Sequence, residues 1–336
     1  MKKIINDAET IVDEMLDGMV KAHSDVVKRI PNTTVIVRKQ LSETPKVGIV
    51  SGGGSGHEPS HAGYVGKGML DAAVAGEVFT SPTPDQVFEA IKAVDQGKGV
   101  LLVIKNYNGD VMNFEMAAEL AEDEGIEVKQ VIVNDDIAVE DSTHTTGRRG
   151  VAGTVLVHKA VGALAEKGGS LDEVKAAAEK LISQTKTLGV ALSPAYVPGS
   201  GNPGFGIGDE EMEIGIGIHG EPGLSREKLK TANEIADLLL NKLTAELDLL
   251  KGDEVAVMVN GLGSTPLMEL YVLNNRAADV LEEKGIQIGS TYVGEFMTAI
   301  EMAGASITLA KLDSGLKELL LAPAQTAAFT QSESGS

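Results

Sequence analysis

The sequence contains no cysteine and no tryptophan, and aromatic residues make up only 3% of it. The absence of cysteine excludes disulfide bonds, thiolate nucleophiles and cysteine-ligated zinc. Because aromatic side chains are so scarce, the core must consist of aliphatic residues and glycine. The hydrophobic content of 43% and the charged content of 23% are typical of a globular protein.

Basic residues are also few, since the sequence has 29 lysines and arginines and 49 acidic residues, which gives a net charge of −20. Such a surface repels phosphate backbones and anionic lipids, so we expect neither a nucleic acid nor a membrane partner. No apolar run approaches the roughly 20 residues of a membrane span. The N-terminal sequence MKKIINDAETIVDEML is too acidic and polar for a signal peptide. We therefore expect a cytoplasmic protein.

The length of 336 residues favours two domains. In the first half of the chain, apolar strands alternate with helical patterns, and the clearest strands cover 46–50, 99–105 and 128–133. This alternation predicts an α/β fold with a mostly parallel sheet covered by helices.

A stretch rich in glycine, proline and serine at 191–211 interrupts this pattern, and a second α/β pattern of different order follows it. We therefore predict an N-terminal α/β domain at 1–189 and a smaller C-terminal α/β domain at 190–329. Residues 330–336 are small and polar and are expected to form a flexible tail.

The sequence GGGSGHEP at 52–59 stands where a strand ends and a helix is expected to begin. Backbone N–H groups at such a position bind phosphate, although the spacing is neither that of a Walker A loop nor that of a dinucleotide fingerprint. The length of the glycine run, together with His57, favours a binding loop over a simple tight turn. If HEPSHAGY at 57–64 is helical, His61 shares a helix face with His57.

The sequence NYNGD at 106–110 occupies the equivalent position after another strand. Loops that follow parallel strands emerge at the same edge of the sheet, where ligands of open α/β sheets bind. We therefore expect His57, Lys105, Asn106 and Asp110 to lie within reach of one small molecule. Asp110 is either a general base for a substrate hydroxyl or the N-cap of the next helix, and the local sequence leaves both open.

The sequence IGIGIHGEPG at 214–223 carries another exposed histidine. The alternation predicts a strand over 214–218 with one face of bare backbone, which a ligand or another chain can approach. His219 is then a nucleophile or base that Glu221 orients through the other ring nitrogen. The alternative is a structural histidine at a strand end.

The strand at 128–133 is followed by four acidic residues, Asp135, Asp136, Glu140 and Asp141. They either hold magnesium or form a solvated face, and the solvated face is the favoured interpretation. No HExxH or other zinc-ligand spacing occurs, so we predict no metal site.

The adjacent Arg148 and Arg149 hold a phosphate or an acidic partner, or they cap local carbonyl groups, and the sequence leaves both open. His23 and His158 lie in amphipathic helical patterns and are expected to be structural.

Several motifs in the same order resemble the K subunits of bacterial dihydroxyacetone kinases. The resemblance runs from about residue 1 to residue 328 and is carried by the stretches 50–86, 105–117, 135–159 and 215–223. It implies a homodimer of two-domain α/β subunits that bind dihydroxyacetone.

The resemblance also implies the roles of individual residues. It assigns His219 the addition to the ketone carbon, which gives a covalent hemiaminal. It assigns His57 and Asp110 the proton of the hydroxyl that becomes phosphorylated. The remaining substrate-contacting positions that it implies are Gly54, Ser55, Gly56 and Lys105.

We find no nucleotide-binding fingerprint in the sequence, so we expect no cofactor on this chain. The resemblance implies that ADP or ATP and Mg²⁺ bind a separate L subunit, which a phosphoprotein of the phosphotransferase system re-phosphorylates. One alternative is a non-catalytic dihydroxyacetone-binding coactivator or sensor. Another is a kinase subunit for a different short keto sugar.

Overall fold

The computed structural model describes residues 2–139, 147–200 and 203–332. The chain divides into two compact units, and the predicted α/β architecture of two parts is confirmed. Unit 1 comprises Met1–Val133, Val155–Lys180 and Glu318–Ser336, and unit 2 comprises Asn134–Thr154 and Leu181–Lys317. The division into domains at 1–189 and 190–329, with a flexible tail after them, stays a prediction.

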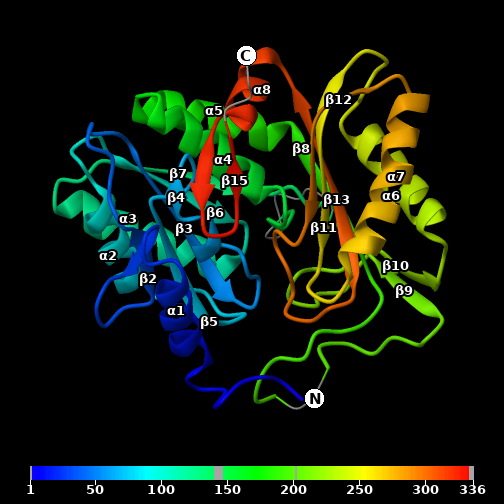
Figure 1. Cartoon of the computed structure of the whole chain (residues 1–336), viewed down its shortest axis with the longest axis horizontal. Helices are drawn as coiled ribbons and strands as arrows, with labels where there is room; N and C mark the ends of the chain where they lie inside the picture. The colour runs from blue at the N-terminus through cyan, green and yellow to red at the C-terminus, as the bar shows by residue number, and fades with distance from the viewer. Residues whose placement is uncertain (1, 140–146, 201–202, 333–336) are drawn as a thin grey trace. The chain divides into compact units, whose positions relative to one another are not determined.

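Unit 1 contains a six-stranded sheet with the strand order β1-β2-β5-β3-β6-β7 (Figure 1). Its strands are β1 (Val27–Arg29), β2 (Val35–Arg38), β3 (Gly48–Ser55), β5 (Ala72–Val78), β6 (Val100–Lys105) and β7 (Val128–Val133). Strands β5, β3, β6 and β7 run parallel, whereas β2 pairs antiparallel with both of its neighbours, β1 and β5. The mostly parallel sheet is therefore confirmed, and β3 and β6 end at the same edge.

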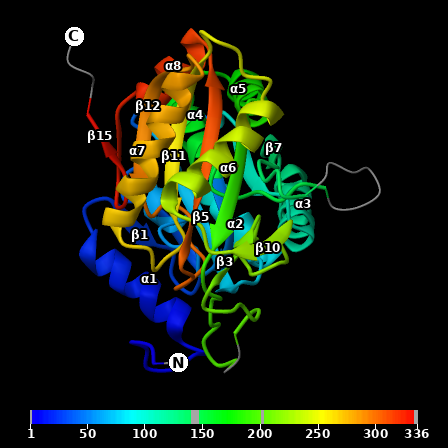
Figure 2. The same cartoon turned by 90° about the vertical axis from the view of Figure 1, so that its right-hand side faces the viewer.

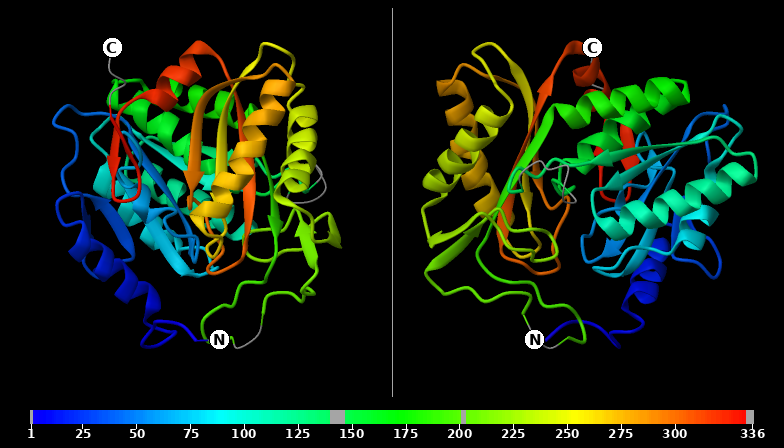
Figure 3. Two further views of the ribbon diagram at one scale, coloured as in Figure 1. Left: turned by 45° about the vertical axis from the view of Figure 1, so that its right-hand side comes forward. Right: turned by 180° about the vertical axis from the view of Figure 1, so that it is seen from behind.

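Helices cover this sheet, and every residue of β6 is buried, as expected for a strand covered on both faces. Helices α2 (Pro84–Val94) and α3 (Asn108–Asp123) pack side by side against the sheet (Figure 3, right). The other helices of unit 1 are α1 (Ile11–Ala22), η1 (Ala62–Tyr64), α4 (Thr154–Glu166) and α5 (Leu171–Ser183). A small antiparallel sheet is formed by β4 (Gly66–Lys67), β14 (Ala324–Thr326) and β15 (Thr330–Gln331).

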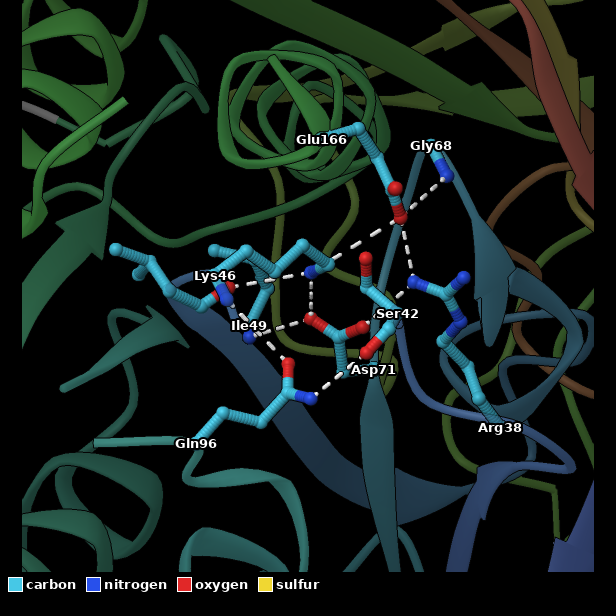
Figure 4. A network of polar contacts seen from close by, with 9 residues as sticks. Arg38, Ser42, Lys46, Ile49, Gly68, Asp71, Gln96 and Glu166 are labelled. Carbon is cyan, nitrogen blue, oxygen red and sulfur yellow. Dashed lines mark hydrogen bonds and ion pairs between the residues drawn. The ribbon is translucent and has the colours of Figure 1, made fainter. Parts of the chain in front are cut away.

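A buried ion network connects the sheet of unit 1 to the end of α4 (Figure 4). The carboxylate of Asp71 accepts hydrogen bonds from Lys46 Nζ at 2.5 Å, from Arg38 Nη1 at 2.9 Å and from the backbone N–H of Ile49 at 2.9 Å. Arg38 also pairs with Glu166, the last residue of α4. Two positive and two negative side chains therefore balance each other, as buried charges require.

Unit 2 contains a second six-stranded sheet with the order β10-β9-β8-β13-β11-β12. Its strands are β8 (Thr185–Ala191), β9 (Glu211–Ile214), β10 (Ser225–Lys228), β11 (Glu254–Gly261), β12 (Gln287–Gly294) and β13 (Gly304–Leu312). All neighbours are antiparallel except β11 and β12. Helices α6 (Ala232–Glu246) and α7 (Leu267–Glu283) lie side by side on this sheet (Figure 2), and α8 (Ser314–Leu321) follows β13.

Helix α6 begins with a capping box, in which Thr231 and Glu234 each accept a hydrogen bond from the other's backbone N–H group. Within the described ranges, no helix has both the length and the apolar character that crossing a bilayer demands.

Candidate functional site

The first three glycines of GGGSGHEP, at positions 52–54, lie inside strand β3 and not in a turn. A Cβ atom at Gly52 would overlap the carbonyl oxygen of Val74, and one at Gly54 would lie 2.6 Å from the backbone nitrogen of Thr80. The glycines are therefore required because the backbone at and beyond β5 passes very close to β3. This close approach explains why the run is longer than a turn needs.

The helix expected directly after this motif is absent, so the predicted phosphate loop at a helix N-terminus is wrong. Residues 56–61 form bends and turns, and only the 3₁₀ turn η1 follows them. His57 and His61 accordingly do not share an α-helix face. A proline at position 59 and the backbone hydrogen bond from Ser60 to His57, at 3.0 Å, accompany this irregular path.

The buried Lys105 and Asp110 form an ion pair beside the glycine run. Lys105 is the last residue of β6, and its Nζ lies 3.1 Å from Asp110 Oδ2. The other carboxylate oxygen of Asp110 accepts a hydrogen bond from the Ser81 hydroxyl. A Cβ atom at Gly53 would overlap Lys105 Nζ and lie 3.5 Å from Asp110 Oδ2. The two motifs therefore meet at one edge of the sheet, as the topology predicts.

Asp110 is not the N-cap of α3, because that helix is capped by Tyr107 and Asp110 lies in its first turn. The N-cap alternative is therefore wrong. A carboxylate in the first turn is favoured by the helix dipole. Ser81, which the sequence reading missed, comes from the loop before α2 and carries no motif that would have marked it.

His57 is completely buried, and its ring stacks on Phe79 with a centroid distance of 5.1 Å. Phe79 has a positive φ of 56° and donates its backbone N–H to the carbonyl oxygen of Ser55. The hydroxyl of Ser55 donates to the carbonyl oxygen of Gly76 at 2.7 Å. The backbone N–H of Gly56 donates to the Glu58 carboxylate. These contacts fix the path of the loop that carries His57.

A cavity of about 240 Å³ borders the same glycine run. It is lined on one side by Gly53, Gly54 and Ser55 and on another by Met15 and Met19 of α1. No sequence motif indicated this cavity, because the methionines fit the amphipathic pattern of an ordinary helix.

The buried His61 and His158 contact each other, with His61 Nδ1 2.9 Å from His158 Nε2. Burial lowers the pKa of the His158 imidazole to about 3, and the positive charge of Lys105 acts in the same direction. Burial and then Lys105 also lower the pKa of His61 well below its usual range. The expected structural role of His158 fits these contacts, and His23 directly follows helix α1.

His219 lies in a turn of unit 2, since strand β9 ends at Ile214. The strand predicted over 214–218 is therefore wrong. Gly215 and Gly220 have φ values of 77° and 81°, which only glycine adopts readily, so these residues turn the chain and do not line a bare strand face.

The carboxylate of Glu221 holds His219 at two points. Its Oε1 lies 2.8 Å from His219 Nδ1, and its Oε2 accepts the backbone N–H of His219 at 3.1 Å. Burial opposes the charge of Glu221, but the hydrogen bond from His219 and nearby positive charge lower its pKa to about 2. An ionised carboxylate only accepts hydrogen bonds, so Nδ1 carries the proton and the lone pair is on Nε2.

Asp135 and Asp136 are buried, so the favoured prediction of a solvated acidic face is wrong for them. Asp135 accepts hydrogen bonds from the backbone N–H groups of Val151 and Gly153. Asp136 pairs with Arg149. Glu140 and Asp141 lie outside the described residues. Among the described residues, no group of three or more histidine and acidic side chains is arranged to hold a metal.

Both arginines of the adjacent pair donate to carbonyl groups. Arg148 donates to the Val139 carbonyl at 3.2 Å and pairs with Glu246 at 2.7 Å. Arg149 donates to the Gly215 carbonyl at 2.8 Å. The carbonyl-capping alternative therefore describes these contacts, and each arginine has an acidic partner as well.

Comparison with known proteins identifies the family of the chain. Residues 17–328 match the Dak1 domain family. The chain is 59% identical to the PTS-dependent dihydroxyacetone kinase 1, dihydroxyacetone-binding subunit DhaK, of Listeria innocua, over 98% of this chain and 100% of that protein.

Two solved structures are also similar. The dihydroxyacetone kinase operon co-activator Dha-DhaQ has a TM-score of 0.90 and 40% identity, with 95% of this chain and 98% of that chain covered. The dihydroxyacetone kinase of C. freundii has a TM-score of 0.91 and 36% identity, with 98% of this chain and 60% of that chain covered. The resemblance found in the motifs is thus confirmed, and the chain belongs to the Dak1 family, with the dihydroxyacetone-binding subunits of dihydroxyacetone kinases among its relatives.

Proposed function

We propose that this chain is the dihydroxyacetone-binding catalytic subunit of a dihydroxyacetone kinase, which yields dihydroxyacetone phosphate. The observation that carries the proposal is the geometry of His219, whose Nδ1 faces the Glu221 carboxylate and whose lone pair is therefore on Nε2. The names of the relatives, and the high identity over the full chain, support the same substrate.

In the first step, the lone pair of His219 Nε2 attacks the ketone carbon of dihydroxyacetone. A C–N bond forms, the π electrons of the carbonyl move to its oxygen, and that oxygen takes up a proton from solvent, which gives a hemiaminal with a positively charged imidazole ring. A small uncharged substrate offers little area for contacts. Reversible bond formation therefore separates a ketone from an alcohol such as glycerol more sharply than contacts do.

In the second step, a terminal hydroxyl of the bound substrate attacks the terminal phosphoryl group of a nucleotide. Asp110 takes the hydroxyl proton as general base, with His57 assisting, and the nucleoside diphosphate leaves. Lys105 and Ser81 support this role because they hold both oxygens of the Asp110 carboxylate in place. Gly54, Ser55 and Gly56 are the proposed backbone contacts of the substrate.

The phosphoryl donor is proposed to be a nucleotide with Mg²⁺ on a separate L subunit, re-phosphorylated by a phosphotransferase-system phosphoprotein in the cytoplasm. The chain spans the whole Listeria innocua subunit, which is named as PTS-dependent. It spans only 60% of the C. freundii kinase, so a further part of that chain is available for the nucleotide. We propose that the chain itself acts as a homodimer.

A coactivator that senses dihydroxyacetone is the second candidate, because Dha-DhaQ is 40% identical over 95% of this chain. A sensor needs His219 to bind the ketone but needs no general base. The buried Lys105–Asp110 pair favours the kinase over the sensor. Competition between dihydroxyacetone and other short keto sugars in the kinase assay distinguishes a dihydroxyacetone kinase subunit from one that serves another sugar.

The decisive experiment combines intact mass spectrometry with a reconstituted assay that contains an L subunit and its phosphodonor. We expect a dihydroxyacetone adduct on the unmodified chain, its loss in His219→Ala, and an adduct without turnover in Asp110→Ala. An adduct on His219→Ala would refute the covalent role. Full turnover by Asp110→Ala would refute the base, and an unmodified chain that forms the adduct without any turnover would identify the sensor.

A further inference from the structure

The buried Arg149 contacts two residues of the turn that carries His219. Arg149 donates its Nε to Asp136 Oδ2 at 2.8 Å and its Nη2 to the carbonyl oxygen of Gly215 at 2.8 Å. Its third nitrogen, Nη1, lies 3.9 Å from Glu221 Oε2. The planar guanidinium therefore reaches the first residue of the turn and the carboxylate at its end with one rigid group.

Gly217 provides the space for this contact. A Cβ atom at position 217 would overlap Glu221 Oε2 and lie 2.6 Å from Arg149 Nη1. Any other residue would therefore separate the guanidinium from the carboxylate. The alternation of IGIGI thus serves two purposes, since Gly215 turns the chain and Gly217 leaves room for the ion pair.

We propose that Arg149 is a positioning residue that acts through Glu221 to keep the proton of His219 on Nδ1 and the lone pair on Nε2. This proposal rests on the proposed function of His219 as the nucleophile. Asp136 anchors the arginine from the opposite side, and its backbone N–H bonds the Arg149 carbonyl oxygen at 3.0 Å.

The charges of this group suit the addition step. When Nε2 bonds to the ketone carbon, the imidazole ring becomes positively charged. Asp136 and Arg149 balance each other, so the group of Asp136, Arg149 and Glu221 keeps one net negative charge beside the ring. Glu221 therefore stabilises the imidazolium that forms, provided that Arg149 holds it at the right distance.

The tautomer of His219 can be measured without substrate by ¹⁵N NMR of histidine-labelled protein. We expect the Nδ1-protonated form in the unmodified chain and a mixture of tautomers in Arg149→Met. Arg149→Lys should restore the Nδ1-protonated form in part, because lysine keeps the positive charge but lacks the planar guanidinium. Gly217→Ala should behave like Arg149→Met without removing any charged group. The proposal is overturned if folded Arg149→Met and folded Gly217→Ala both give the same His219 tautomer signal as the unmodified chain.

Two matched controls separate positioning from general damage. Arg148→Met removes the neighbouring arginine, whose carbonyl and carboxylate contacts are at Val139 and Glu246. Gly206→Ala adds a methyl group where nothing lies within 4 Å. Both variants should keep the tautomer of the unmodified chain, and a shift as large as that of Arg149→Met would overturn the assignment to Arg149.

Adduct formation with labelled dihydroxyacetone then connects positioning to chemistry. We expect the rate of adduct formation to fall about a hundredfold in Arg149→Met, because a small displacement of a reacting group can slow a reaction by that factor. The rate should recover in part in Arg149→Lys. An unchanged rate in Arg149→Met beside an altered tautomer would overturn the link to the addition step. If the unmodified chain forms no adduct while the tautomer responds as expected, the proposed nucleophile fails and the control of the tautomer by Arg149 stands.

Discussion

The ammonium group of Lys105 lies 3.1 Å from the Oδ2 atom of Asp110, and both side chains are almost completely buried. Removal of the ammonium in Lys105→Met leaves a buried carboxylate that keeps the hydrogen bond from the Ser81 hydroxyl but has lost its positive partner. We expect the free energy of unfolding to fall by about 3–5 kcal/mol, measured by urea denaturation at pH 7.

Lys129→Met is the control for this prediction. Lys129 pairs with Asp172, whose side chain is 84% exposed, so its removal should leave the urea midpoint nearly unchanged. Equal midpoints for the two lysine variants would show that Lys105 does not neutralise a buried charge.

The ion network around Asp71 predicts a similar loss elsewhere in unit 1. Asp71→Asn removes the charge that faces Lys46 and Arg38, whereas Glu166 reaches Lys46 only at 4.0 Å. We expect the free energy of unfolding to fall by about 3 kcal/mol. Thermal and urea unfolding of Asp71→Asn and of the surface variant Asp172→Asn would test this, and the idea is wrong if both behave like the unmodified chain.

Two glycines in helices provide a matched pair with opposite expected signs. A Cβ atom at Gly162 of α4 would overlap the backbone of Met69, whereas nothing lies within 4 Å of one at Gly18 of α1. Gly18→Ala should therefore stabilise the protein by about 0.5–1 kcal/mol. Gly162→Ala should destabilise it by about 1–3 kcal/mol. Stabilisation by both substitutions in differential scanning calorimetry would contradict the close approach of α4 to Met69.

The buried His158 predicts how stability depends on pH. Its folded pKa of about 3 lies below the value of 6.5 for an unperturbed histidine, so between these values the unfolded state binds more protons. Stability should therefore fall as the pH drops below about 6.5, and one such histidine removes about 2 kcal/mol at pH 5.

His158→Gln tests the assignment of this dependence. The variant should lose less stability between pH 7 and pH 5 than the unmodified chain, as judged by urea unfolding at both values. An identical loss in the two proteins would assign the pH dependence to other groups.

The architecture of unit 1 was predictable because its signals are local. Apolar runs such as GVLLVIK contain enough β-branched and leucine residues to identify buried strands, and their alternation with helices predicts parallel pairing. That topology also predicts Lys105 at the end of β6 and Asp110 close after it, at the same edge of the sheet.

The errors occurred in the glycine-rich segments that precede His57 and His219. IGIGI alternates like a strand, but its Gly215 adopts a φ of 77° and ends β9. GGGSGH resembles a binding loop that precedes a helix, but its first four residues belong to β3, where the backbone packs against Val74 and Thr80. The contacts of Asp136 with Arg149 and of His61 with His158 join distant positions, and no spacing in the sequence encodes them.

The small sheet of unit 1 pairs β4, near residue 66, with β14, near residue 325. When only the first 189 residues have been synthesised, β14, the strand that pairs with β4, is still missing. The hydrogen bonds between β4 and β14 form only after residues 325 and 326 have been translated. During synthesis the edge of β4 stays open to other chains, which makes it a natural position for chaperone protection.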